Sequence, residues 1–242
     1  MVKRHFSFTE LLVVCLCVLL VGAMLVPVYG NATRQAKQYN CTDNLKGIGI
    51  MLAIYADDHD DVLLPAFRIY PGDHIQNWMY YLWQTYKLDP KSMLCPEADD
   101  AFAIGSCPAN ANYHRAQSYG MHYESVLDNY QNLHPSFTRA LLQEQGQNPA
   151  AHILVADSVA NATGTKSNVP GDISAFISAH GGYYQNGELK SGGGWYPVHI
   201  RHNNKANLLM HDGHVEARSG EEIFANDKAL WKPMFYDWKW QK

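Results

Sequence analysis

The sequence predicts an α+β fold in which a long N-terminal helix packs on a C-terminal antiparallel β-sheet head with loop insertions. Two observations predict it. An apolar run of about 19 residues, Leu11 to Tyr29, leads directly into a stretch whose apolar residues have helical spacing. Near the other end, two short apolar runs flank an Asp-Gly pair, which is typical of a β-hairpin. Of the 242 residues, roughly 200 remain outside the apolar run, enough for one sizeable domain.

The N-terminal part of the chain divides by composition. The apolar run is longer than that of a secretory signal peptide and is close to the ~20 residues that span a bilayer. Lys3 and Arg4 precede it and should keep the N-terminus cytoplasmic, so the bulk of the chain lies outside. We expect a basic leader, a transmembrane half of the helix, an amphipathic half and a globular head over residues 1–5, 6–30, 31–56 and 57–242.

Glu10 is the only charged residue between Phe6 and Gly30. A carboxylate at this depth costs a few kcal/mol unless it is neutralised or paired. If the chain were cut between His5 and Phe6, Phe6 would carry a free α-amino group and Glu10 would be the fifth residue. The ammonium of one copy could then pair with Glu10 of its neighbour, staggered along an axis. This pairing indicates a self-assembling filament.

The same segment resembles the class III signal of type IV pilins and type II secretion pseudopilins. That signal has a basic leader, a cleavage point, an aromatic first residue, a Glu at the fifth mature position and about 20 apolar residues. Phe6, Glu10 and the apolar run match it, and Pro27 matches a helix-kinking proline often found there. His5 departs from the pattern, because the family usually presents Gly or another small residue before the cut.

The amphipathic half predicts one buried helical face. Apolar residues recur at spacings of 4, 3, 4 and 3, which place them on one side of a helix that should pack on the head. They are Cys41, Leu45, Ile48, Leu52 and Tyr55. Ile50 and Ile54 are expected to widen the stripe. The acidic stretch Ala56–Asp61 should end the helix, and we interpret its carboxylates as a solvated helix end and not as a cation site.

The head contains several local signals. A helical spacing predicts a short helix over residues 77–88, and residues 152–158 (HILVADS) predict a core strand with Asp157 at its end. Short helices are expected near residues 136–145 and from Ser219, and a long loop over residues 160–196. The hairpin is predicted as Asn207–Met210, a turn at Asp212-Gly213 and a return strand over His214–Ala217.

A second resemblance covers the head. The run CTDNLKGIGIMLAIYADDHDDVLLP, a Trp-containing helix and then Cys-Pro resemble a large group of pilin-like proteins from planctomycete and lentisphaere bacteria. His202, nine intervening residues and Asp212-Gly213 match the H-x9-D-G signature found with such N-termini, here within residues 202–217. On this resemblance we expect a disulfide between Cys41 and Cys95, with Cys95–Cys107 as the alternative. Cys15 and Cys17 should behave as small apolar residues.

The resemblance implies a structural pilin or pseudopilin subunit, and no enzyme. A prepilin peptidase would cleave after His5 and methylate Phe6, and Glu10 and Pro27 would serve assembly. The chain would span the bacterial inner membrane once, with its head periplasmic or extracellular, before joining a helical filament of copies of itself. An assembly platform of a pilus or secretion system would be a partner. No cofactor is implied. The net charge of −4 and the lack of a basic stripe make nucleic acid a poor candidate partner.

Two alternatives stay open, and both keep the N-terminus as an uncleaved membrane anchor. One is a metal-dependent enzyme with His202, His211 and His214 as weak ligand candidates. The plainer interpretation is that His202 and Asp212 hydrogen-bond and stabilise the hairpin.

The other alternative is an extracytoplasmic binding protein. The chain has 15 Tyr, 6 Trp and 8 Phe, and Trp195, Tyr183 and Tyr184 in the predicted loop could bind polysaccharide. Such residues are more often core or interface.

Overall fold

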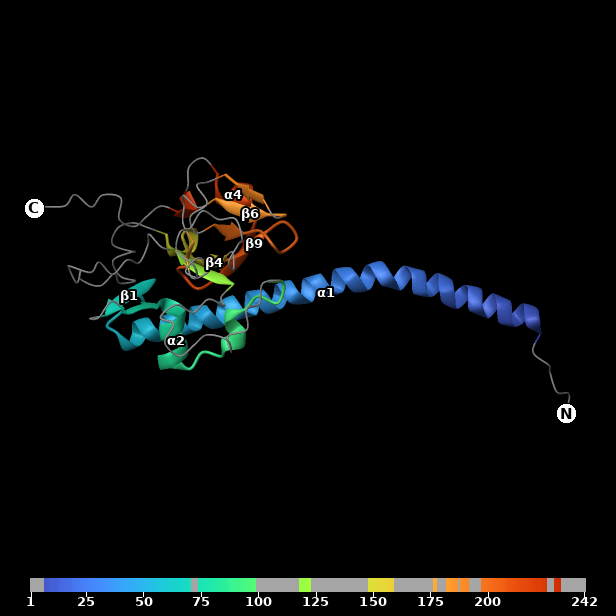
Figure 1. The fold of residues 1–242 in the computed structure, drawn as a ribbon, viewed down its shortest axis with the longest axis horizontal. Coiled ribbons are helices and arrows are strands. Elements are labelled where there is room, and N and C mark those ends of the chain that lie inside the picture. The colour runs from blue at the N-terminus through green and yellow to red at the C-terminus, as the bar shows by residue number, and fades with distance from the viewer. Residues whose placement is uncertain are drawn as a thin grey trace, which may run out of the picture.

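A computed structural model describes residues 7–70, 74–98, 118–122, 148–158, 176–177, 182–186, 188–191, 197–225 and 229–231. Within them, a single long helix, α1, projects from a mixed head that also contains the described strands and shorter helices (Figure 1). The C-terminal half of α1 lies along the head, and its N-terminal half extends away from it. The helix expected near residues 136–145 lies outside the described ranges.

Helix α1 runs without interruption from Phe8 to Asp58, which is 51 residues or about 77 Å at 1.5 Å per residue. It begins with a capping box, in which the side chain of Ser7 caps the first turn and the Glu10 carboxylate accepts the backbone N–H of Ser7 at 2.8 Å. The helix continues through Pro27 and follows a gentle arc (Figure 1). The long helix predicted from the sequence is therefore confirmed.

The buried face of α1 is the one that the spacing predicts. All five residues of that face are at most 5 % exposed and belong to one core cluster: Cys41, Leu45, Ile48, Leu52 and Tyr55. The expected widening by Ile50 and Ile54 is wrong, because these side chains are 60 % and 39 % exposed. Each lies two positions beyond a buried residue, and two helical positions are about 200° apart around the axis.

The centre of the head is a five-stranded sheet in the order β10-β9-β4-β3-β5. The first four strands are antiparallel to their neighbours, and β5 pairs parallel to β3. A long helix packed on an antiparallel sheet makes the fold α+β, as predicted. The strands are β3 (Tyr119–His122), β4 (Ile153–Asp157), β5 (Phe176–Ile177), β9 (Ala206–Met210) and β10 (Val215–Arg218).

The strands β3, β4 and β9 of this sheet are buried on both faces, whereas β10 is partly buried. Leu209 of β9 packs with the buried face of α1, whereas its neighbours Leu208 and Met210 belong to a second cluster on the opposite side, as the alternation of side chains along a strand requires. The second cluster includes Tyr183 and Trp231. The described head is thus layered, with α1 on one side of the sheet and a smaller layer on the other (Figure 1).

The smaller layer contains a three-stranded sheet in the order β7-β6-β8 and the short helices α4 and η5. The long loop expected over residues 160–196 is wrong, because β6 and β7 of this layer and β5 of the central sheet lie within that range. Alternation over two or three residues is too short to register as a strand pattern. The elements are β6 (Tyr183–Gln185), β7 (Glu188–Lys190), β8 (Val198–His199), α4 (Gly220–Ile223) and η5 (Ala229–Trp231).

Of the remaining elements, η3 lies beside β9, and the others lie near the C-terminal half of α1 (Figure 1). Helix α2 is capped by Asn77 and buries Trp78 and Leu82, which confirms the short helix predicted there. The other sequence signals are also confirmed, since Ser219 caps α4 and β9 and β10 form the hairpin around Gly213, whose φ is +90°. These elements are β1 (Phe67–Tyr70), β2 (His74–Asn77), α2 (Trp78–Tyr86), η1 (Pro90–Met93) and η3 (Pro149–Ala151).

Two truncations on α1 test which face holds the head. Leu45→Ala removes a fully buried side chain and should lower the free energy of unfolding of the head by about 2–5 kcal/mol. Ile50→Ala is the matched control, because Ile50 is 60 % exposed, and it should cost less than about 1 kcal/mol. Denaturant unfolding of the detergent-solubilised chain, followed by tryptophan fluorescence, measures both. Equal losses would contradict the assigned face.

Candidate metal centre

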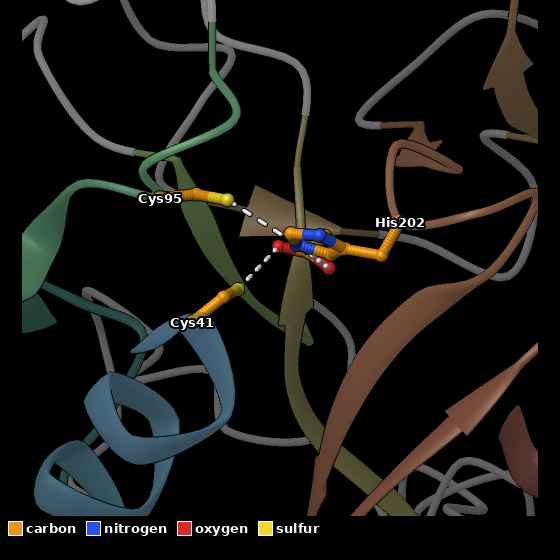
Figure 2. A group of neighbouring side chains, drawn as sticks. Cys41, Cys95 and His202 are labelled. Carbon is orange, nitrogen blue, oxygen red and sulfur yellow. Dashed lines mark hydrogen bonds and ion pairs between the residues drawn. The ribbon is translucent and has the colours of Figure 1, made fainter. Parts of the chain in front are cut away.

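Four side chains from four separate parts of the chain meet where α1 joins the head. They are Cys41, Cys95, Asp157 and His202, all buried, and one potential ligand atom from each lies within 4.8 Å of the others. Figure 2 shows the two thiols and the imidazole directed toward a common point. Cysteine, histidine and aspartate are all zinc ligands, so this group is the candidate functional site.

Each member is positioned by a local feature of the sequence. Cys41 is the first buried residue of α1 among those whose burial is described, so it marks the point at which the helix meets the head. Cys95 follows η1, and its backbone N–H donates to the Ser118 hydroxyl at 2.9 Å. Asp157 is the last residue of β4.

His202 is placed by a tight turn between β8 and β9. The backbones of His202 and Lys205 exchange two hydrogen bonds of 2.9 Å. The two residues between them, Asn203 and Asn204, both have positive φ, which a two-residue turn of type I′ requires and which Asn tolerates. The turn thereby holds the imidazole of His202 in the cluster.

The contacts within the cluster are short. The Cys41 thiol donates to Oδ1 of Asp157 at 3.4 Å, and Nε2 of His202 lies 3.2 Å from Sγ of Cys95 and 3.4 Å from Oδ2 of Asp157. On the other side of the imidazole, Nδ1 lies 2.7 Å from the Glu97 carboxylate. His202 therefore bridges the cluster and an outer carboxylate.

The buried carboxylate remains ionised. Burial alone would raise the pKa of Asp157, but the hydrogen bond from His202 and the charge of Arg201 outweigh it and hold that pKa below its usual value. Asp157 Oδ2 also accepts the backbone N–H of Asn207 at 2.7 Å. Burial would likewise lower the pKa of His202, but Asp157 and Cys95 raise it to about 10. His202 and Asp157 thus form a buried ion pair.

The two thiols differ in acidity. The hydrogen bond from Cys41 lowers the pKa of Cys95 to about 6, with burial opposing it and His202 adding to it. Burial raises the pKa of the Cys41 thiol, which also accepts a hydrogen bond from the Tyr119 hydroxyl at 3.3 Å. The arrangement favours a thiolate at Cys95, and thiolate is the form that binds metals.

The disulfide expected between Cys41 and Cys95 is not formed. The structure brings Cys41 and Cys95 together, as that pairing requires, yet both are free thiols. Each thiol contacts another side chain of the cluster: Cys41 contacts Asp157, and Cys95 contacts His202. Cys107, the alternative partner, lies outside the described residues.

The hydrogen bond expected between His202 and Asp212 is not formed. His202 turns into the head toward Glu97 and Asp157, whereas Asp212 lies in the β9–β10 loop and pairs with His214 at 2.6 Å. Nine residues separate the two in sequence, but β9 lies between them and carries the chain from the cluster to the far end of the hairpin.

Of the three histidines considered as ligands, only His202 belongs to the cluster. His211 follows β9, and burial lowers its pKa to about 3, so its imidazole is neutral. His214 is exposed. Among the described residues, the acidic stretch at the end of α1 likewise contributes to no metal-type group.

The other expected sites lie elsewhere. Glu10 is exposed near the far end of α1, Pro27 lies within that helix, and His5 and Phe6 are outside the described residues. Tyr183 is 6 % exposed and stacks on Phe224, which corrects its assignment to a sugar-binding surface. Trp195 is not among the described residues.

Sequence reasoning missed Cys41, Cys95 and Asp157 as co-ligands of His202, and Glu97 beside them. The signals were present singly: Asp157 at the end of a core strand, and the Asn203-Asn204 pair typical of a tight turn after His202. The convergence of residues 41, 95, 157 and 202 depends on tertiary structure.

Comparisons with known proteins found no relative of this chain. No protein-family model, no curated protein and no solved structure matches this chain.

Asp157 and Asp212 offer a matched test of the cluster. Asp157→Asn leaves the charges of His202 and Arg201 buried without their carboxylate, so it should lower the free energy of unfolding by about 3–5 kcal/mol. Asp212→Asn changes a partly exposed ion pair and should cost less than about 1 kcal/mol. Denaturant unfolding measures both variants. A loss at Asp157 no larger than at Asp212 would contradict the assigned network.

Proposed function

We propose that this chain is a structural subunit of a pilus-like or secretion-type filament, anchored in the membrane and polymerising through its N-terminal helix. The observation that carries this proposal is the N-terminal half of α1. Residues 7–24 are all exposed, although an 18-residue window of the helix has a mean hydropathy of 3.0. Such a surface needs an apolar environment.

The length of that half fits a bilayer. The helix is long and apolar enough to cross a membrane, and about 20 residues of α-helix span the hydrocarbon core. Among the residues of α1 whose burial is described, Cys41 is the first that is buried, so the polar residues 31–40 separate the apolar part from the buried face. This division supports a membrane segment before assembly and a helical bundle of copies after it.

Glu10 favours a filament over a simple anchor. The capping box uses Glu10 to cap the start of the helix, but burying its charge in apolar surroundings still costs a few kcal/mol unless a partner neutralises it. The hydrogen bond that Glu10 accepts from Ser7 satisfies one of its oxygens, and the charge remains for a partner. A free α-ammonium on Phe6 of a neighbouring copy is the partner that cleavage after His5 would create.

The proposal includes the partners that the resemblance to pilins implies. A prepilin peptidase would remove residues 1–5 and methylate Phe6, and an assembly platform would extract subunits from the inner membrane. The head would then lie on the filament surface. The competing function is a membrane-anchored protein that keeps its leader and stays monomeric.

Intact-mass analysis of the chain from its native host separates the two functions. We expect a mature chain that lacks residues 1–5 and carries a methylated Phe6, because the filament pairing needs a free N-terminus at that residue. A full-length chain that remains monomeric in membranes would support the anchored protein instead.

Glu10→Gln tests the charge pairing itself. Glutamine at this position keeps the capping box but removes the charge, so we expect assembly to be lost while the head stays folded. Ser7→Ala is the control, because it removes the cap and keeps the charge, and it should still assemble. Electron microscopy of sheared filaments and head fluorescence are the measurements. Normal filaments from Glu10→Gln would rule out the pairing.

A further inference from the structure

We infer that Cys41, Cys95, Asp157 and His202 bind one zinc ion that joins α1 to the head. This site goes beyond the proposed function and does not depend on it, because a monomeric anchored protein would use the same junction. Cys41 comes from α1, whereas the other three ligands come from the head.

The spacing of the ligand atoms fits a tetrahedral ion. With Zn–S bonds of about 2.3 Å and Zn–N and Zn–O bonds of about 2.0–2.1 Å, the edges of such a site are about 3.3–3.8 Å long. One such edge, from Sγ of Cys95 to Nε2 of His202, is 3.2 Å long. Asp157 presents one oxygen to each neighbour, with Oδ1 3.4 Å from Sγ of Cys41 and Oδ2 3.4 Å from Nε2 of His202. All four atoms lie within 4.8 Å of one another, so small movements complete the coordination.

The surroundings of the ligands are those of a metal site. A histidine that binds zinc through one ring nitrogen usually donates the other N–H to a carboxylate, which orients the ring. Nε2 of His202 points into the cluster, and Nδ1 lies 2.7 Å from the Glu97 carboxylate. Hydrogen bonds from the backbone of Asn207 and the hydroxyl of Tyr119 orient Asp157 and Cys41 in the same way.

The charges of the four ligands can also be offset. Zinc displaces the protons of the two thiols and of Nε2 of His202, so the ligands contribute two thiolates, one carboxylate and a neutral imidazole. This set carries −3, which the ion reduces to −1. The Arg201 guanidinium supplies the compensating positive charge, because it is buried close enough to Asp157 and both cysteines to interact with them electrostatically.

The ligand set favours zinc over a disulfide. A Cys41–Cys95 disulfide would make no use of the carboxylate and imidazole beside it, which would then be buried as an ion pair at a desolvation cost. Two thiolates with an imidazole select zinc over magnesium or calcium, which prefer oxygen ligands. Since four buried protein ligands close the coordination sphere, the site is structural.

Metal content of the purified full-length chain tests the inference. The chain, solubilised in detergent from zinc-supplemented cells, should contain about one zinc per chain, and Cys41→Ser and Cys95→Ser should lose it. The matched controls are Cys15→Ser and Cys17→Ser, whose thiols are exposed on the apolar half of α1, and His214→Gln in the hairpin loop. All three controls should keep the zinc.

A second measurement uses the unaltered chain, because ligand variants can fail to fold. Replacing zinc with Co²⁺ should give the intense sulfur-to-cobalt charge-transfer absorption of a thiolate site. Glu97→Gln should weaken zinc affinity about 10–100-fold, measured by competition with a chromophoric chelator, without removing a ligand. Unchanged affinity in Glu97→Gln would overturn the outer role of Glu97.

Three results would overturn the site. One is a chain without zinc whose mass and peptide map show a Cys41–Cys95 disulfide. Another is a chain with free thiols that binds no zinc or cobalt on titration. The third is a full zinc content in the double variant Cys41→Ser, Cys95→Ser, which would place the ion elsewhere. None of these results bears on filament assembly, which the Glu10→Gln variant tests separately.

Discussion

The structure depends on one junction, where the buried face of α1 meets the central sheet. Cys41 begins that face, and the ion pair of Asp157 and His202 lies directly against it. Beyond Cys41 the helix buries a continuous apolar stripe against β9 and its neighbours. Before Cys41, none of the helix residues whose burial is described is buried. The chain therefore has two regions with opposite solvent requirements, and this junction connects them.

A junction of this kind must resist separation of the helix from the head. Apolar burial of a few side chains at about 1.5–3 kcal/mol each supplies most of the attraction. A buried ion pair adds specificity at a desolvation cost, so its presence needs a reason beyond stability. The arrangement of two thiols, a carboxylate and an imidazole around one point gives that reason if an ion joins them. The junction and the proposed assembly helix are then separate parts of one long element, α1.

Sequence patterns between neighbouring residues predicted several elements of the structure correctly. The spacing along residues 41–55, the helical spacing in α2, the β-rich apolar run of β4 and the Asp-Gly turn each depend on neighbours in sequence, and each is confirmed. Two local predictions are wrong. Ile50 lies two positions after the buried Ile48 and therefore on the opposite side of the helix, and the strands β5 to β7 are too short to show an alternating pattern in the sequence.

By itself the sequence determined the long helix, its division into an apolar and an amphipathic half, and an α+β head. These features follow from periodicity and composition, which depend on residues close together in the sequence. Only the tertiary structure decided that His202 faces Glu97, Asp157 and Cys95 instead of Asp212, and that Cys41 and Cys95 meet as thiols. Ligands contributed by residues 41, 95, 157 and 202 have no common spacing in the sequence. Their meeting results from the order of the strands and from the turn at Asn203-Asn204, which together bring distant segments to one point.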